Sequence, residues 1–300
     1  MSSIKNLAIT VGAILVTLET GNIAKAAIFL GNSPQKLGNG MINSYVVVDD
    51  LTGEPASIGL TFDVGILSGL SDGETDSEDH SHEHEHIDTV MLSLPSQASS
   101  TAFEFVAVNW NPDGHPPTGV YNTPHFDFHF YTIPQSIQQQ INPANPQFPS
   151  AAYKVPPPGF VPADYYLIPN TAVPGEGSHW ANFNAPEWQG VPHGFEQTFL
   201  YGYWQGIMAF QEPMVTYEFL INQQNRSTFS EAINLPAFFP KTAFYPTSYS
   251  ISFDSSTSIY NVSLDHLTWR VATPVPEPFT LLGAGIAVGF GFLFKQKFPS

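Results

Sequence analysis

The 300-residue sequence contains no cysteine, which excludes disulfides, thiolate catalysis, iron–sulfur clusters and zinc sites with cysteine ligands. Basic side chains are scarce as well, because 9 Lys and Arg stand against 26 Asp and Glu, for a formal charge of −17. A chain with so little positive charge cannot assemble the basic face that phosphate contacts need, so nucleic acid is excluded as a partner. A phosphate-binding loop and a dinucleotide fingerprint are also missing.

What the sequence has in quantity is proline, glycine and phenylalanine, at 27, 23 and 24 residues, with only 12% charged side chains. This composition predicts an all-β fold, an antiparallel sandwich or barrel-like structure with few short helices, in one domain over 27–274. Strands are expected where β-branched or aromatic residues alternate, at 44–48, 58–62, 103–108, 125–131, 199–207, 214–221, 249–253 and 260–264. Short helices are expected at 135–141 and after the capping-box spacing at 228–231.

The amino end is typical of a secretory signal peptide over residues 1–26. Lys5 precedes a mostly apolar stretch at 7–18, and Ala24 and Ala26 occupy the −3 and −1 positions of a cleavage site. The apolar stretch is short for a membrane span, so export with cleavage by signal peptidase is favoured over a buried first helix or an uncleaved anchor. Without both tails, residues 27–276 carry five basic and 24 acidic side chains, a formal charge of −19.

The carboxyl end has three parts: Pro276, Glu277 and Pro278, then sixteen mostly apolar residues, then Lys295 and Lys297. As a helix, the apolar part would be about 24 Å long, against a hydrocarbon core of about 30 Å. The layout over 275–300 resembles the PEP-CTERM sorting signal. That resemblance implies a short transmembrane helix that anchors the chain in the membrane until exosortase processes it, and then a location at the cell surface, in the periplasm or in the extracellular matrix. Exopolysaccharide is the partner that this location implies.

A run of acids and histidines at 72–88 contains His80, His82, His84 and His86 beside eight carboxylates. Since it has no apolar residue before position 87, it is expected to be a disordered, solvated loop. The alternating imidazoles predict weak affinity for Zn²⁺, Cu²⁺ or Ni²⁺. The alternative, which we favour, is a soluble acidic insertion whose histidines only titrate.

The strand expected at 125–131 would place His125, Asp127 and His129 on one face and three phenylalanines on the other. Neighbours on one face are about 6.6 Å apart, so His125 with Asp127, or Asp127 with His129, can share one metal ion. The two histidines are about 13 Å apart and would need a bulge to do so. A complete site would also need a ligand from elsewhere. The alternative is a polar strand face whose side chains hydrogen-bond to one another.

Two further residues are candidate ligands from elsewhere. His179 follows a proline-rich loop in the segment Gly-Ser-His-Trp, where it either closes over the strand face or packs on Trp180. Glu212 lies in a polar break at 211–213 that predicts a hairpin turn, where its carboxylate either reaches the site or stays exposed.

Together these segments resemble the TTHB-like domain-of-unknown-function family. The blocks that carry the resemblance are Gly-His-Pro-Pro (114–117), Pro-His-Phe-Asp-Phe-His-Phe-Tyr (124–131), Gly-Ser-His-Trp (177–180) and Glu-Pro-Met-Val-Thr (212–216). The resemblance runs from about residue 38 to 270 and implies a predominantly β extracytoplasmic domain without a settled activity. The residues on its motif positions are candidate ligands for zinc or another divalent metal: His125, Asp127, His129, His179 and Glu212.

The sequence therefore predicts an exported, surface- or matrix-associated protein, processed by exosortase, that acts as a non-enzymatic binding or structural protein and can bind a divalent metal. The alternative is a metal-dependent enzyme, hydrolase or cupin-like, that uses the strand from His125 through Asp127 to His129. In that case Glu212 or Asp127 would act as general base on a metal-bound water. A carbohydrate-binding module is a third hypothesis, which rests on the abundance of Trp and Tyr alone.

Overall fold

The computed structural model describes residues 26–72 and 88–274. The predictions made for the signal peptide, for the histidines of the 72–88 run and for the sorting signal fall on 1–25, 73–87 and 275–300, outside the described residues. Among the described residues, no helix is long and apolar enough to cross a membrane.

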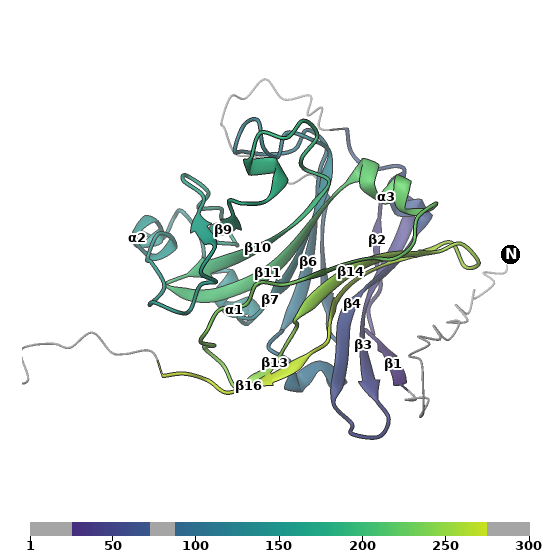
Figure 1. Cartoon of the computed structure of the whole chain (residues 1–300), viewed down its shortest axis with the longest axis horizontal. Helices are drawn as coiled ribbons and strands as arrows, with labels where there is room; N and C mark the ends of the chain where they lie inside the picture. The colour runs from purple at the N-terminus through teal and green to yellow at the C-terminus, as the bar shows by residue number, and fades with distance from the viewer. Residues whose placement is uncertain (1–25, 73–87, 275–300) are drawn as a thin grey trace, which may run out of the picture.

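Two seven-stranded sheets dominate the fold, and every strand pairing within them is antiparallel (Figure 1). The first has the order β1-β3-β4-β15-β14-β12, with β2 paired to β3. Its strands are β1 (Ala26–Leu30), β2 (Gln35–Leu37), β3 (Gly40–Asp49), β4 (Pro55–Asp63), β12 (Phe229–Ala232), β14 (Ser248–Asp254) and β15 (Ile259–Asp265).

The second sheet has the order β5-β6-β7-β11-β10-β9-β8. Its strands are β5 (Asp88–Ser93), β6 (Phe105–Asn111), β7 (His125–Tyr131), β8 (Tyr165–Leu167), β9 (Ser178–Asn182), β10 (Gln197–Trp204) and β11 (Ile207–Thr216). A small third sheet pairs β13 (Ala243–Tyr245) with β16 (Thr268–Arg270). The helices are short: η1 (Val64–Leu67), η2 (Ser96–Ser100), α1 (Gln135–Gln138), α2 (Phe148–Ala152), η3 (Pro186–Trp188) and α3 (Tyr217–Gln223).

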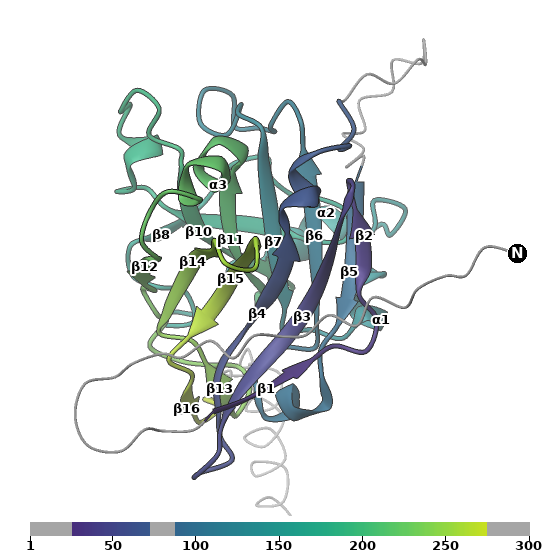
Figure 2. The same ribbon diagram turned by 90° about the vertical axis from the view of Figure 1, so that its right-hand side faces the viewer.

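The main core lies between the two large sheets, and Figure 2 shows the first sheet in front of the second. The phenylalanines of β7 (Phe126, Phe128 and Phe130) are fully buried in it, as their alternation predicted. Phe128 stacks on Phe62 of β4, with ring centroids 6.1 Å apart, so the sheets contact each other directly. The all-β prediction is thus confirmed, with the sandwich as its form.

The outer face of the second sheet is covered by the chain that connects its strands. On one side, Ile141 and Phe148 pack on Phe210 of β11 in a second apolar cluster. On the other, Tyr121 and Phe195 belong to a third apolar cluster on β9, β10 and β11. The histidines of β7 lie on this covered face, and they are buried for that reason.

Several local predictions are confirmed. The pairs at 44–48 with 58–62 and at 249–253 with 260–264 form antiparallel hairpins, as β3 with β4 and β14 with β15. A helix begins at Gln135, although it ends at Gln138 instead of continuing to 141. The strand expected at 125–131 is β7, with the same bounds.

Three predictions were wrong. Residues 229–232 form the strand β12, because pairing with β14 overrides the local capping-box spacing. The strand expected over 214–221 ends at Thr216, whose hydroxyl accepts a hydrogen bond from the Phe219 amide and caps α3. The hairpin turn expected at 211–213 lies instead at Gln205 and Gly206, which both have positive φ, as in a two-residue type I′ turn. Glu212 is therefore inside β11.

Candidate metal centre

The pairing of β7 with β11 sets Glu212 opposite His129. Gln211 pairs with Phe130, and Met214 pairs with Asp127. The register is therefore the same before and after a short gap in the pairing. Pro213 lies in this gap, and it has no N–H to donate to a neighbouring strand. Because Glu212 and His129 point to the same outer face, their side chains meet: His129 Nε2 is 3.3 Å from Glu212 Oε1.

The opposite side of the centre comes from β9 and the turn before it. His179 on β9 faces the same surface, two strands away from Glu212. The turn is closed by hydrogen bonds from the amides of Glu176 and Gly177 to the carbonyl of Val173. Gly177 has a φ of +94°, and a Cβ there would lie 2.4 Å from the Tyr203 carbonyl oxygen, so only glycine fits. This tight turn brings Glu176 back over His179.

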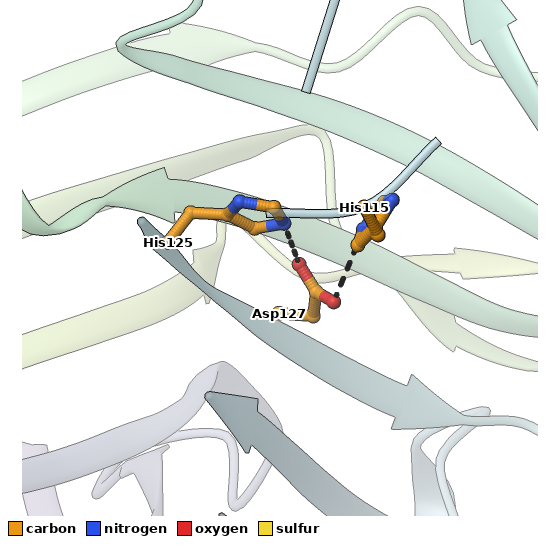
Figure 3. Close-up of side chains that lie close together, drawn as sticks. All are labelled: His115, His125 and Asp127. Atoms are coloured by element: carbon orange, nitrogen blue, oxygen red, sulfur yellow. Dashed lines mark ion pairs between the residues drawn. The ribbon is translucent and has the colours of Figure 1, made fainter. Parts of the chain in front are cut away.

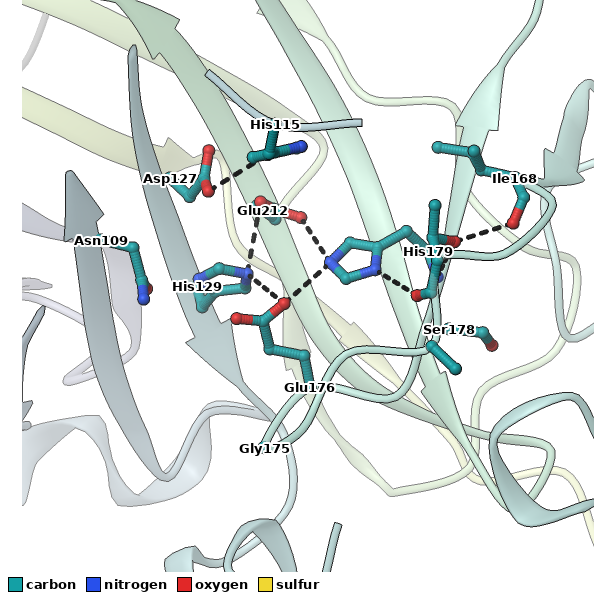
Figure 4. Close-up of polar contacts among 12 residues, drawn as sticks. Asn109, His115, Asp127, His129, Ile168, Gly175, Glu176, Ser178, His179 and Glu212 are labelled. Atoms are coloured by element: carbon teal, nitrogen blue, oxygen red, sulfur yellow. Dashed lines mark hydrogen bonds and ion pairs between the residues drawn. The ribbon is translucent and has the colours of Figure 1, made fainter. Parts of the chain in front are cut away.

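Four side chains therefore converge on one point (Figure 4). His179 Nε2 lies 3.2 Å from Glu176 Oε2 and 3.8 Å from Glu212 Oε2. His129 Nε2 lies 3.8 Å from the same Glu176 oxygen. The side chains are almost closed to solvent, at 1% exposure for His129 and Glu212, 8% for Glu176 and 10% for His179. His129, His179 and Glu212 form a group that can hold a metal ion.

The rings are held in place by their surroundings. His179 Nδ1 lies 3.1 Å from the Thr171 carbonyl oxygen, which can only accept, so Nδ1 carries the proton and Nε2 keeps its lone pair for the centre. This backbone contact is the usual outer-shell partner of a metal-ligating histidine. Phe210 packs against His129 and His179, with ring centroids 4.7 and 5.3 Å apart. A Cβ on Gly202 would lie 2.0 Å from the Phe210 ring, so the glycine makes room for it.

The electrostatics of the centre favour a bound cation. Burial raises the pKa of Glu212 well above its usual 4.5, and the charges of Asp127 and Glu176 raise it further. Without a cation, Glu212 therefore keeps its proton to a higher pH than a carboxyl group in water does. A divalent ion would balance the charges of Glu212 and Glu176 when both are ionised and would favour the ionised form of Glu212.

A second group of side chains lies on the same face, at the start of β7 (Figure 3). It contains His115, from the loop after β6, with His125 and Asp127. Asp127 lies 3.1 Å from His125 Nε2 and 3.5 Å from His115 Nε2, measured to its two carboxylate oxygens. The amide of Asn111 donates a hydrogen bond of 2.7 Å to Asp127 Oδ2.

Opposite charges dominate this second group. Burial raises the pKa of Asp127, but the charges of His125 and His115 and their short contacts with the carboxylate outweigh burial and hold it well below 3.8. Burial lowers the pKa of His115, while the hydrogen bond and charge of Asp127, with smaller contributions from the Pro116 carbonyl and Glu176, raise it to about 9.

The five sequence-predicted ligands thus divide between two groups. His129, His179 and Glu212 come together, and His125 and Asp127 lie beside them with His115. The sequence reasoning missed Glu176 and His115 as ligands. Glu176 precedes His179 by three residues in a glycine-rich segment, and His115 is the second residue of the Gly-His-Pro-Pro block that carried only the family resemblance.

Comparison with protein-family models, with curated proteins and with solved structures finds no match for this chain. The resemblances to PEP-CTERM proteins and to the TTHB-like family stay predictions.

The metal affinity of the group formed by His129, His179 and Glu212 is expected to rise with pH, because Glu212 must lose its proton before it can bind a cation. Below the raised pKa of Glu212, affinity should fall by about tenfold for each pH unit. The metal-free protein should behave in the opposite sense: its carboxyl binds a proton more tightly when folded, so stability declines as the pH rises from 4.5 through the raised pKa. Competition titrations with a chelator and unfolding curves, both between pH 5 and 8, measure the two slopes. Parallel slopes would contradict the assignment of Glu212 as a ligand.

Proposed function

We propose that this chain is an exported extracytoplasmic β-sandwich protein that binds one divalent transition metal ion, with Zn²⁺ as the best fit, in a closed centre made by His129, His179, Glu176 and Glu212. One observation carries the proposal. Tetrahedral zinc with bonds of 2.0–2.1 Å separates its ligand atoms by about 3.3 Å. In this centre the Nε2 atoms of His179 and His129 lie 3.2 and 3.8 Å from one oxygen of Glu176. They lie 3.8 and 3.3 Å from Glu212, each measured to a different carboxylate oxygen.

The closed geometry supports a structural or binding role over catalysis. Structural zinc sites use four protein ligands, whereas catalytic sites keep a position open for water or substrate. Here four side chains face one point, and each is at least nine-tenths buried. Two surface clefts, both lined by Glu187, His193 and Glu196, involve none of the four ligands. An ion in this centre would tie β7, β9 and β11 together and stabilise the second sheet.

The exported location is supported by the sequence of both tails. The signal-peptide pattern at 1–26 and the tail at 275–300 carry the proposal of export and exosortase processing, followed by association with the cell surface or matrix. The strong negative charge of the body keeps such a protein soluble by self-repulsion.

Native mass spectrometry of the protein recovered from the cell-surface fraction tests both parts of the proposal. Replacing the four histidines of 80–86 with Asn first removes their metal binding, which gives the reference chain. We expect that chain to begin at Ala27 and to carry at least one ion that survives an excess of a weak chelator such as nitrilotriacetate. Glu212→Gln should carry one ion fewer than the reference chain, because it removes a charged ligand at almost constant size. The matched control Glu54→Gln, in the exposed turn between β3 and β4, should carry as many ions as the reference chain.

The two parts can fail separately. A reference chain that still contains residues 1–26 would contradict export with cleavage. A reference chain without an ion, or a Glu212→Gln variant with as many ions as the reference chain, would contradict the metal centre.

A further inference from the structure

We propose that His115, His125 and Asp127 form a second metal site, separate from the closed centre, which keeps one coordination position open for a small exchangeable ligand. The site takes a divalent transition ion, because imidazole and carboxylate donors suit Zn²⁺, Co²⁺ or Cu²⁺. Its ligand atoms all lie within 4.8 Å of one another, and it shares no ligand with the four residues of the closed centre.

In their neutral form the two histidines present lone pairs to the carboxylate. His125 Nδ1 lies 2.6 Å from the Thr123 carbonyl oxygen, and His115 Nδ1 lies 2.7 Å from that of Pro116. A carbonyl oxygen only accepts, so each Nδ1 carries a hydrogen and each neutral ring has its lone pair on Nε2. Both Nε2 atoms face Asp127, at 3.1 and 3.5 Å. When both rings are neutral, these lone pairs repel the carboxylate unless a cation lies between them.

Two buried atoms at this point need a partner. His125 Nε2 and Asp127 Oδ1 are shielded from solvent, and neither has a hydrogen-bond partner of good geometry within the described parts of the chain. Both side chains are at most 3% exposed, and leaving such buried polar atoms unpaired is destabilising. The other carboxylate oxygen is held by Asn111, which fixes the orientation of Asp127. A metal ion between the three ligands satisfies both atoms together.

The site is open on one side. His115 is 24% exposed, whereas His125 is fully buried and Asp127 is almost so. Figure 3 shows His115 and His125 on two sides of the carboxylate. Three protein ligands with one solvent-facing edge leave a fourth position for water or a small anion, unlike the closed centre with its four ligands. This arrangement is the one that metal-activated water requires.

The rival occupant is a proton. A proton between each imidazole and Asp127 would also neutralise the repulsion and would leave the group as a buried ion pair. The two occupants differ in stoichiometry and in their response to an added ligand, so a metal titration separates them.

The test is a Co²⁺ titration of the full chain, in the reference background with Asn at 80, 82, 84 and 86, and with nitrilotriacetate present to suppress weak sites. We expect two Co²⁺ per chain, and azide should shift the visible absorption of one of them, because only the open site can accept it. His115→Ala should bind one Co²⁺ without an azide response. The control His193→Asn, an exposed histidine whose positive φ suits Asn, should bind two.

Glu212→Gln separates this proposal from the closed centre. It should lose the azide-insensitive ion and keep the azide-sensitive one, even if the closed centre has no physiological role. The ion retained by His115→Ala shows that this variant still folds. One Co²⁺ in the reference chain with no azide response, or an azide response that survives His115→Ala, would overturn the second site in favour of the ion pair.

Discussion

Stripping the ion from the metal-loaded protein is expected to lower its midpoint of thermal unfolding by about 10 °C. A ligand that binds only the folded state, at a thousandfold excess over its dissociation constant, stabilises that state by about 4 kcal/mol. For a domain of this size, each kcal/mol shifts the midpoint by about 2–4 °C. The reason for the effect is the position of the ligands, since Glu176, His179 and Glu212 link the turn before β9 to β11. Differential scanning calorimetry with and without chelator, in the reference background, measures the shift.

The variant Glu212→Gln is a control for this prediction, because it should lower the effect of chelator on the unfolding midpoint and raise the midpoint of the metal-free protein. Its midpoint should respond less to chelator than that of the reference chain, because the ion of the closed centre is no longer bound. Without metal it should unfold at a higher temperature than the metal-free reference chain, since it removes a carboxyl group whose pKa is raised by burial and by the charges of Asp127 and Glu176. A reference chain indifferent to chelator, or a metal-free Glu212→Gln several degrees less stable than its parent, would be incompatible with the centre.

Truncating Phe128 to alanine is expected to reduce the free energy of unfolding by about 3–5 kcal/mol. The ring is fully buried between the sheets, where it stacks on Phe62 and Phe126 at 6.1 Å in each case. Its removal leaves a cavity that a sandwich of two sheets cannot close by a local shift. Guanidinium unfolding of the metal-free protein measures the loss.

The control for Phe128 is Phe238→Ala, a phenylalanine that is 42% exposed and should cost far less. The Phe128→Ala variant should still bind its ion well below its unfolding midpoint, because the ligands of β7 lie on the opposite face of the strand. Equal losses for both variants would mean that the phenylalanines of β7 are not the core between the sheets.

The sequence was a good guide to elements whose pattern is local. The strand β7 has the bounds that alternation between Pro124 and Pro134 predicted, and its aromatic face is buried as expected. The capping-box pattern at 228–231 misled because it is a short-range preference. Pairing of β12 with β14 along a sheet edge outweighed it.

The candidate site was predictable in its residues and unpredictable in its grouping. That His125, Asp127 and His129 share a face follows from the period of a strand. Glu212 meets His129 because of the register between β7 and β11, two strands separated by about 80 residues of chain. The contact also depends on the position of the hairpin turn, at 205–206 instead of 211–213. Glu176 escaped notice because a Gly-Glu-Gly segment indicates a turn without indicating which strand the turn folds back on.

The wide spacing of the four ligands along the chain, from 129 to 212, also sets an order of events. A strong ion site exists only after β7, β9, β10 and β11 have assembled, so a chain that crosses a membrane unfolded would travel without this ion. The supply of metal at the destination, and not in the compartment of synthesis, would then decide how much of the protein reaches its most stable form. Occupancy of the centre would report that maturation is complete.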